Sequence, residues 1–451
     1  MNYADLLRDA AERGIRYLQE SEDRRVAPTP GALERMDELN LDLPANGRDT
    51  KQVLAMLDEL GSPATVAMAG PRYFGFVIGG SLPAALAANW LAGAWDQNAF
   101  APAASPVGAK LQEISIRWLR EIFDFPDGSD GALVSGATVA NYCGIMAARH
   151  ALLAKHGWDV EAEGLYGAPE IQVVVGGEAH SSLIKALGMA GLGRERLTRV
   201  PVDDQGRMRA DALPNLTDLT LLCIQAGNVN SGAFDPAEEL CTAAHEASAW
   251  VHVDGAFGLW AAASPKLAHL AKGVNQADSW ASDAHKWLNV PYDCGFVFVR
   301  APENLGDAFS QRAAYLTRTQ SHEPYDYTPE SSQRARGVDV WAALLSLGKA
   351  GLADMIERNC EQAQQMATGL KKAGFEILND VVLNQVVVSF GKDDRTNRMI
   401  TALQQDGTFW AGGTVWKGRA AMRISFSSWR TTKEDVDRSL QAVLRMSKEV
   451  T

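Results

Sequence analysis

Short apolar runs alternate with helical segments between residues 131 and 300, and this alternation constrains the fold more than any other feature of the chain. The runs are rich in β-branched residues, whereas the segments between them show the spacing of helix faces. The runs lie within residues 131–134, 171–177, 219–227, 250–256, 278–287 and 294–300. Because they are apolar on both faces, we expect an α/β fold with a mainly parallel sheet sandwiched by helices.

The chain of 451 residues is predicted to have three parts. Residues 1–70 form an N-terminal helical arm, with amphipathic helices over 3–20 and 51–60. Residues 71–340 form the large sheet domain. Residues 341–451 form a small C-terminal α+β domain, in which two helices (341–352 and 354–373) precede short strands, a helix near 395–406 and a last helix from Lys433.

Composition excludes several classes of partner. The 43 Lys+Arg and 55 Asp+Glu give a formal net charge of −12, which argues against binding to nucleic acid. The longest nearly uncharged apolar stretch, Leu82 to Trp95, is too short to span a bilayer. We therefore expect a soluble protein with neither nucleic acid nor membrane as a partner.

The five cysteines form no CxxC pair, and their number is odd. We expect reduced thiols in a cytoplasmic protein and no structural metal site. The N-terminus is charged and helical in pattern, unlike a secretory signal.

The segment SDAHKW (282–287) places Lys286 just after an apolar strand. A lysine in such a position can form an imine with an aldehyde, although a His-Lys pair alone fits a surface lysine equally well. Asp254 ends the strand VHVD (251–254), at the strand edge where ligands bind in open α/β sheets. A carboxylate there can pair with a pyridinium nitrogen, or simply cap a loop.

Two further elements complete the pattern. In LVSGATVAN (133–141) a strand ends in small residues and a helix begins, so that backbone N–H groups and the Thr138 hydroxyl can face an anion. The alternative is a plain helix cap. His180 follows the strand IQVVVGG and can stack on an aromatic cofactor, or be a hydrogen-bonded core histidine. Taken together, the four elements predict a site for pyridoxal 5′-phosphate.

These residues resemble those of the group II pyridoxal-phosphate-dependent decarboxylases of fold-type I, which include aromatic L-amino acid, glutamate and tyrosine decarboxylases. The motifs that carry the resemblance run in the family's order over nearly the full chain. They are GPRYFGF (70–76), EAHSS (178–182), FDP (234–236), HVDGA (252–256), DAHKW (283–287) and AAMRISFSSWRTT (420–432). The resemblance implies a seven-stranded-type sheet and an amino acid decarboxylase.

The resemblance also implies roles for individual residues. Lys286 resembles the Schiff-base lysine and Asp254 the pyridinium partner. The other implied cofactor contacts, some also catalytic, are Gly136, Ala137 and Thr138 at the phosphate, His180 and Ala256 at the ring, and His285 before the lysine. Two departures stand out. Asp283 replaces an asparagine that the family often has near the phosphate, so Ser282 or a backbone group is expected there instead. Val229 interrupts a stretch that is often rich in threonine, which leaves Asn228 or Ser231 near the ring's exocyclic oxygen.

The family's covering loop maps to about residues 315–330 and acts on the partner's site in a homodimer. Its candidate proton-donating tyrosines are Tyr327 and, slightly less favoured, Tyr325; the alternative is that both pack against the domain surface. The substrate pocket is expected to be mainly apolar and to favour an aromatic or bulky apolar amino acid. It is expected to include Phe76, Ile78, Asn98 and Phe100. Arg423 fits either a carboxylate contact or a salt bridge.

Three activities of this superfamily remain open. The first is decarboxylation to an amine. The second is aldehyde synthesis, in which oxygen intercepts the carbanion. The third is carbon–carbon bond cleavage. A non-enzymatic scaffold is disfavoured, because both Lys286 and Asp254 are present.

Overall fold

A computed structural model describes residues 3–310 and 323–450. The chain forms two compact units. The first comprises Met1–Gly80, Gln362–Leu378 and Val386–Thr451, and the second Ser81–Glu361 and Asn379–Gln385. This division differs from the predicted three parts, because the N-terminal arm belongs to the same unit as the C-terminal region. Long-range bonds explain the grouping: the Val26 amide donates to the Gly407 carbonyl, and the Arg430 guanidinium to the Ser21 hydroxyl.

The second unit contains a seven-stranded sheet, in the order β1-β7-β6-β5-β4-β2-β3. The strands are β1 (Asp130–Val134), β7 (Gly295–Val299), β6 (Ser279–Asp283), β5 (Trp250–Asp254), β4 (Thr220–Gln225), β2 (Gln172–Gly176) and β3 (Leu197–Val200). All run parallel except β7, which is antiparallel to both neighbours. The predicted mainly parallel sheet is confirmed. The edge strand β3 was not predicted, because the exposed Thr198 and Arg199 interrupt its apolar pattern.

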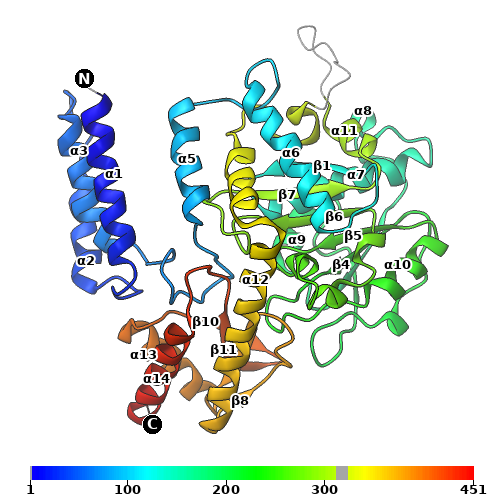
Figure 1. Ribbon diagram of the computed structural model, residues 1–451. Helices are drawn as coiled ribbons and strands as arrows, with labels where there is room; N and C mark the ends of the chain where they lie inside the picture. Colours follow the sequence, from blue (N-terminus) through cyan, green and yellow to red (C-terminus); the bar gives the residue numbers. More distant parts are fainter. Residues whose placement is uncertain (1–2, 311–322, 451) are drawn as a thin grey trace. The chain divides into compact units, whose positions relative to one another are not determined.

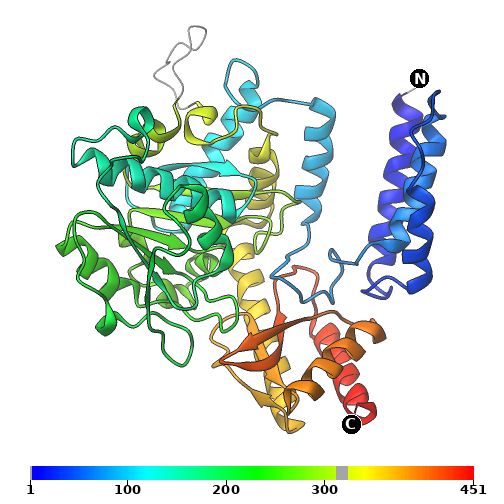
Figure 2. The same cartoon turned by 180° about the vertical axis from the view of Figure 1, so that it is seen from behind.

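Helices cover both faces of this sheet, which Figures 1 and 2 view from opposite sides. The helices that begin in this unit are α5 (Pro83–Trp95), α6 (Pro106–Ile122), α7 (Ala137–Ala154), α8 (Val160–Glu163), α9 (Ser181–Met189), α10 (Ala237–Glu246), α11 (Glu303–Phe309) and α12 (Arg336–Lys372), with short helical turns η3 (Ala210–Ala212), η4 (Gly258–Ala263), η5 (Ala268–Ala271), η6 (Val274–Gln276) and η7 (Pro324–Tyr327). The two helices predicted over 341–373 form the single element α12, which is broken at Gly348 with φ of 60°.

The two sheet faces differ in the size of their side chains. In β6, Ala281 belongs to the core cluster shared with α7, whereas the next residue back, Trp280, stacks on Phe125 at a centroid distance of 4.2 Å. Successive strand residues point to opposite faces, so one strand serves both cores. The small residues allow α7 to approach closely: a Cβ atom on Gly144 would lie 2.6 Å from the His252 ring. This close packing fixes the start of α7 beside the strand ends.

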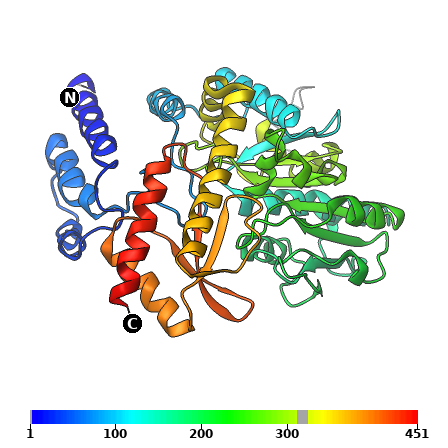
Figure 3. The ribbon, with the colours of Figure 1, turned by 60° about the horizontal axis from the view of Figure 1, so that its bottom comes forward.

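The first unit combines the helical arm with a four-stranded sheet. The arm contains α1 (Tyr3–Glu20), α2 (Pro30–Arg35), η1 (Met36–Leu39), α3 (Thr50–Met56), the π-helical turn η2 (Leu57–Gly61) and α4 (Ser62–Ala64). The sheet has the order β10-β11-β9-β8, with β8 (Glu376–Ile377), β9 (Gln385–Ser389), β10 (Gly412–Trp416) and β11 (Arg419–Ser425). Helix α13 (Asp393–Asp406) packs on β11 and on α14 (Lys433–Glu449), which Figure 3 shows side by side.

Across the described ranges, 3–310 and 323–450, none of the helices combines the length and the apolar character needed to cross a bilayer.

Candidate active site

The predicted cofactor residues gather at one edge of the seven-stranded sheet. Strands β1, β2, β4, β5 and β6 all run toward this edge. Gly136 follows β1, His180 follows β2, and Asp254 ends β5. Lys286 lies three residues beyond the end of β6. The parallel topology therefore brings together residues that are far apart in the sequence.

Asp283, at the end of β6, is the polar centre of this edge. Its Oδ2 lies 2.9 Å from Lys286 Nζ, and its Oδ1 accepts a 2.5 Å hydrogen bond from the Ala137 amide, the first of α7. The Asp283 side chain is only 3% exposed and that of Lys286 18%. Asp283, which replaces an asparagine that the family often has, therefore lies at the start of α7, where the phosphate is predicted.

Asp254 carries an unusual unsatisfied oxygen. The residue is 5% exposed, and its Oδ1 accepts a 3.3 Å hydrogen bond from the Ala256 amide. Its Oδ2 is buried and has no hydrogen-bond partner among the described residues. Burial raises the pKa of Asp254, and the nearby His180 and Lys286 only partly oppose this shift. Such a carboxylate fits a ligand that presents a buried N–H donor.

Two imidazoles at this edge are held in defined tautomers. His180 caps α9, with Nδ1 accepting from the Ser182 amide at 3.2 Å, so its Nε2 carries the proton in the neutral ring. His285 Nδ1 accepts from the Cys294 amide at 3.2 Å. Burial lowers the pKa of His285, which favours the neutral ring. The Nε2 atom of His285 lies 3.6 Å from Asp283 Oδ1.

Gly136 keeps space open at the start of α7. A Cβ atom at this position would lie 3.2 Å from His285 Cε1 and 3.4 Å from Asp283 Oδ1. In the first turn of the 18-residue helix α7, the amides of Val139 and Ala140 donate to the Gly136 carbonyl, and the half-buried Thr138 adds a hydroxyl. This arrangement fits an anion such as phosphate.

The residues at this edge fit pyridoxal 5′-phosphate. Lys286 would hold the aldehyde carbon, Asp254 Oδ2 would accept from the ring nitrogen, and Thr138 with the α7 amides would face the phosphate. When bound, the pyridinium ring supplies an electron sink for the bond that breaks at the substrate.

Three other predicted cofactor contacts have competing local roles. The Ser282 hydroxyl donates to the Gly255 carbonyl at 2.7 Å. Asn228 Oδ1 accepts from the amides of Asn230 and Ser231, which closes the loop after β4. The Ser231 hydroxyl donates to the Gln205 carbonyl at 2.6 Å. Their contact with the cofactor stays a prediction.

Tyr327, one of the predicted loop tyrosines, lies away from Lys286 within the chain. Tyr327 packs against the core cluster, and burial beside Asp130 raises its pKa to about 12. Asp130 begins β1, so Tyr327 is at the edge of the sheet opposite the strand ends that carry Lys286. The action of Tyr327 on a partner's site, and the alternative that it only packs against the domain, both stay predictions. Residues 315–322 of the predicted loop lie outside the described residues.

The predicted substrate residues fall in two places. In the second unit, Phe100 packs on Tyr325 at 5.9 Å between centroids, and Asn98 Oδ1 accepts from the Gln333 amide at 2.9 Å. In the first unit, Phe76 is 63% exposed and lies 5.3 Å from the Trp410 ring.

Ile78 also belongs to the first unit, where its amide donates to the Gly75 carbonyl. Arg423 of the same unit is half-buried near Tyr73, and its partial burial lowers its pKa. The substrate contacts of these residues stay predictions.

The structure also shows a positioning residue that the sequence did not reveal. Trp260 on η4 donates its indole N–H to the Asp283 carbonyl at 2.9 Å and is fully buried. No spacing motif links Trp260 to Asp283, because the contact arises from the turn after β5 folding over the end of β6.

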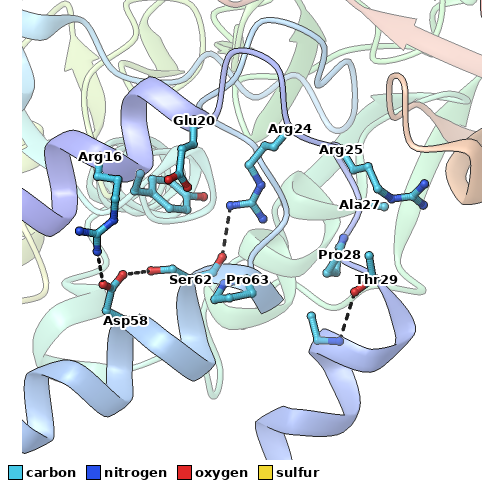
Figure 4. Close-up of a pocket in the computed structure, with 12 residues that line it drawn as sticks. Arg16, Glu20, Arg24, Arg25, Ala27, Pro28, Thr29, Asp58, Ser62 and Pro63 are labelled. Carbon is cyan, nitrogen blue, oxygen red and sulfur yellow. Dashed lines mark hydrogen bonds and ion pairs between the residues drawn. The ribbon is translucent and has the colours of Figure 1, made fainter.

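A separate cleft lies on the arm, within the first unit (Figure 4). Its charged groups bind one another: Arg16 lies 2.5 Å from Asp58, and Arg24 donates to the Ser62 and Thr65 carbonyls. It contains none of the predicted site residues.

Comparisons with known proteins agree with this geometry. Residues 30–391 match the pyridoxal-dependent decarboxylase conserved domain. An aromatic-L-amino-acid decarboxylase from Bacillus atrophaeus is 26% identical, over 97% of this chain and 93% of its own length. A phenylacetaldehyde synthase from Petunia hybrida is 28% identical, over 74% of this chain and 69% of its own length.

The crystal structure of Oryza sativa TDC with PLP and tryptamine superposes with a TM-score of 0.90, at 22% identity, and covers 100% of this chain and 99% of the other. This likeness establishes the fold. The conserved domain covers most of the chain, and its description names the cofactor that fits the sheet edge. The protein therefore belongs to the pyridoxal-dependent decarboxylase family and is a pyridoxal-phosphate-dependent amino acid decarboxylase.

Proposed function

We propose that this enzyme converts an aromatic or bulky apolar L-amino acid to its amine and CO2. The observation that carries the proposal is the buried, unpartnered Oδ2 of Asp254 at the same sheet edge as Lys286. A carboxylate held there keeps the ring nitrogen protonated, which decarboxylation at Cα requires. The similarity to an aromatic-L-amino-acid decarboxylase supports the substrate class.

Each residue of the site has a proposed task. Lys286 Nζ binds the cofactor aldehyde, and its amine takes up or releases a proton when the substrate amine replaces it. His180, held by the bond from the Ser182 amide to its Nδ1, would stack on the cofactor ring. The first turn of α7 binds the phosphate and so fixes the ring relative to Asp254. The His285 ring lies between the turn at Gly136 and the ring of Tyr292. The centroids of the two rings are 4.3 Å apart.

Aldehyde synthesis is the second candidate activity, and the similarity to a phenylacetaldehyde synthase supports it. The two reactions share the same sheet edge and differ in the fate of the substrate carbon after CO2 leaves. Carbon–carbon bond cleavage, the third candidate, has no support among these relatives.

We also propose a cytoplasmic homodimer. All five cysteines are free thiols, four of them buried, as expected in a reducing compartment. Apolar side chains remain exposed in both units. On the arm, α1 buries no residue, and Leu7 is 58% exposed. In the second unit, Trp90 and Leu91 of α5 are 45% and 51% exposed. Apolar surface of this kind marks an interaction site.

The experiment is a panel of L-amino acids scored for CO2, amine, aldehyde and hydrogen peroxide. We expect CO2 and amine in equal amounts from an aromatic or bulky apolar substrate, and little product from glutamate. Aldehyde and peroxide in place of amine would establish the second activity. If the unaltered protein forms no imine absorption with pyridoxal phosphate, the proposed function fails.

The dimer is tested separately by light scattering of Leu91→Glu and of the unaltered protein. We expect the introduced charge to weaken the dimer.

A further inference from the structure

One carboxylate at the active edge conflicts with the anion predicted there. Asp283 Oδ1 accepts from the Ala137 amide at 2.5 Å, and this amide is the first of α7. The same helix start is the proposed binding place of the cofactor phosphate. A helix N-terminus favours one anion because of its free N–H groups and its dipole, but two anions at this distance repel each other.

The backbone of Asp283 is fixed, so the carboxylate cannot leave by a shift of the strand. Its amide donates to the Ala256 carbonyl at 3.1 Å, and its carbonyl accepts from the Trp260 indole at 2.9 Å. The side chain is 3% exposed. Only rotation about the side-chain bonds, which breaks the bond to Ala137, would take the charge away from the helix start.

A second, independent observation shows that this edge is built for a ligand. Asp254 is 5% exposed, and its buried Oδ2 has no hydrogen-bond partner among the residues described. Asp254 ends β5 and Asp283 ends the neighbouring parallel strand β6, so both carboxylates lie at the same edge of the sheet as Lys286. A ring bound between Lys286 and Asp254 would bring its phosphate to the start of α7.

We propose that Asp283 competes with the cofactor phosphate for the first turn of α7 and thereby limits how tightly the chain holds pyridoxal phosphate. Lys286 stabilises the competing state, because its Nζ lies 2.9 Å from Asp283 Oδ2. His285 Nε2 also lies 3.6 Å from Asp283 Oδ1, so binding of the phosphate has to displace the contacts of the carboxylate with Ala137, Lys286 and His285. This inference rests on the proposed place of the phosphate at α7.

The test compares two aldehydes that differ only in the phosphate. Dissociation constants for pyridoxal phosphate and for pyridoxal are measured by equilibrium dialysis and imine absorption, in the unaltered protein and in Asp283→Asn. Any effect on the reactivity of Lys286 acts on both aldehydes, so the ratio of the two constants isolates the phosphate. We expect Asp283→Asn to tighten binding of pyridoxal phosphate about tenfold or more relative to pyridoxal.

Glu178→Gln is the matched control, because Glu178 is exposed on the loop before His180 and loses the same charge. We expect it to leave the ratio unchanged. Asp283→Ser provides a second neutral variant if the asparagine does not fold, and thermal unfolding identifies such a case.

The inference is overturned if the ratio of the two dissociation constants is unchanged in Asp283→Asn and Asp283→Ser. It is also overturned if these variants bind pyridoxal phosphate more weakly relative to pyridoxal, which would show that Asp283 helps to hold the phosphate. An equal shift in Glu178→Gln would also overturn it, since the effect would then come from net charge alone. These outcomes are separate from failure of the proposed function, in which the unaltered protein forms no imine at all.

Discussion

The active edge of the sheet and the cleft on the arm are both rich in charged groups, but they satisfy those groups in opposite ways. On the arm, Asp58 accepts from Arg13, Arg16 and the Ser62 hydroxyl, and Arg24 binds two carbonyls (Figure 4). At the sheet edge, Asp254 keeps one buried oxygen without a partner among the described residues. The Asp58 carboxylate is therefore fully bonded within the protein, whereas the buried Oδ2 of Asp254 is left for a ligand.

This difference separates charge that stabilises the fold from charge that performs chemistry. A saturated surface network contributes little to stability and offers no atom to a ligand. An unsatisfied buried carboxylate costs stability and is retained where function needs it. A hollow shape alone is a poor guide to function here, because the arm cleft contains none of the residues predicted to hold the cofactor.

Substitution of Lys286 should give the largest loss of turnover, and it most directly tests the difference between the sheet edge and the arm cleft. We expect Lys286→Ala to lower turnover by at least about 10³-fold, because Lys286 is the residue proposed to bind the cofactor aldehyde. Borohydride reduction followed by peptide mapping should place the pyridoxyl group on Lys286. Lys110→Ala, on the exposed face of α6, is the control and should retain activity. A pyridoxyl group on any other lysine would contradict the assignment.

Substitution of Asp254 should change activity and stability in opposite directions. We expect Asp254→Asn to lower turnover about 10²–10³-fold, because the ring nitrogen loses its charged partner. After removal of the cofactor, the same variant should gain about 1–3 kcal/mol in unfolding free energy, because a buried charge is removed. Denaturant titration measures this gain.

The matched control, Asp211→Asn, removes an exposed carboxylate paired with Arg209 and should lose less than about 1 kcal/mol. Loss of stability in Asp254→Asn would show that Oδ2 is satisfied in the folded protein.

His252 should give the unit that carries the sheet an acid sensitivity that the arm lacks, since residues 1–70 contain no histidine. It lies between Ser279 Oγ and Asn141 Oδ1, and burial lowers its pKa to about 3. The unfolded chain takes up a proton near pH 6.5, whereas the folded chain does not until about pH 3. As the pH is lowered from about 6.5 to about 3, the free energy of unfolding should therefore fall by about 1.4 kcal/mol for each pH unit.

Denaturation at several pH values should show a shallower slope for His252→Gln, while His269→Gln serves as the exposed control. Equal slopes in all three proteins would mean that His252 titrates normally in the fold.

The loop tyrosines test where the proton donor lies. We expect Tyr327→Phe to keep turnover within about twofold, because its ring packs on the core near Asp130. Tyr325→Phe should behave similarly, since Tyr325 contacts Phe100. Tyr315→Phe completes the set, because Tyr315 is the remaining tyrosine of the predicted loop, outside the described residues. A loss of 10²-fold or more in Tyr327→Phe would point to its action on the partner's site.

Substitution in the arm cleft should give the smallest change in both unfolding free energy and turnover. We expect Arg16→Ala to lower unfolding free energy by less than about 1 kcal/mol and to leave turnover within about twofold, because its partner Asp58 keeps Arg13 and Ser62. Denaturant titration and the decarboxylation assay check both values. A large loss of turnover would break the contrast and give the cleft a part in catalysis.

Much of the fold follows from local patterns. Six of the seven large-sheet strands carry apolar runs that predict them, and the helix α1 has the predicted bounds. The edge strand β3 and the helices α5 and α6 were not predicted. The grouping of the arm with the C-terminal region was also not predicted, because it depends on bonds such as Val26 to Gly407 that join distant residues.

The sequence by itself determined the chemistry: an aldehyde-binding lysine, a carboxylate at a strand end and a small-residue helix start, in an order that identifies the family. These signals are local, since each residue lies at a fixed place on its own strand or helix. Only the tertiary structure decided how the groups meet. It leaves one oxygen of Asp254 unpartnered, sets Asp283 on the first amide of α7, and places Tyr327 at the opposite edge of the sheet. The physical reason is that partnership and burial depend on contacts between strands, which no spacing along one strand encodes.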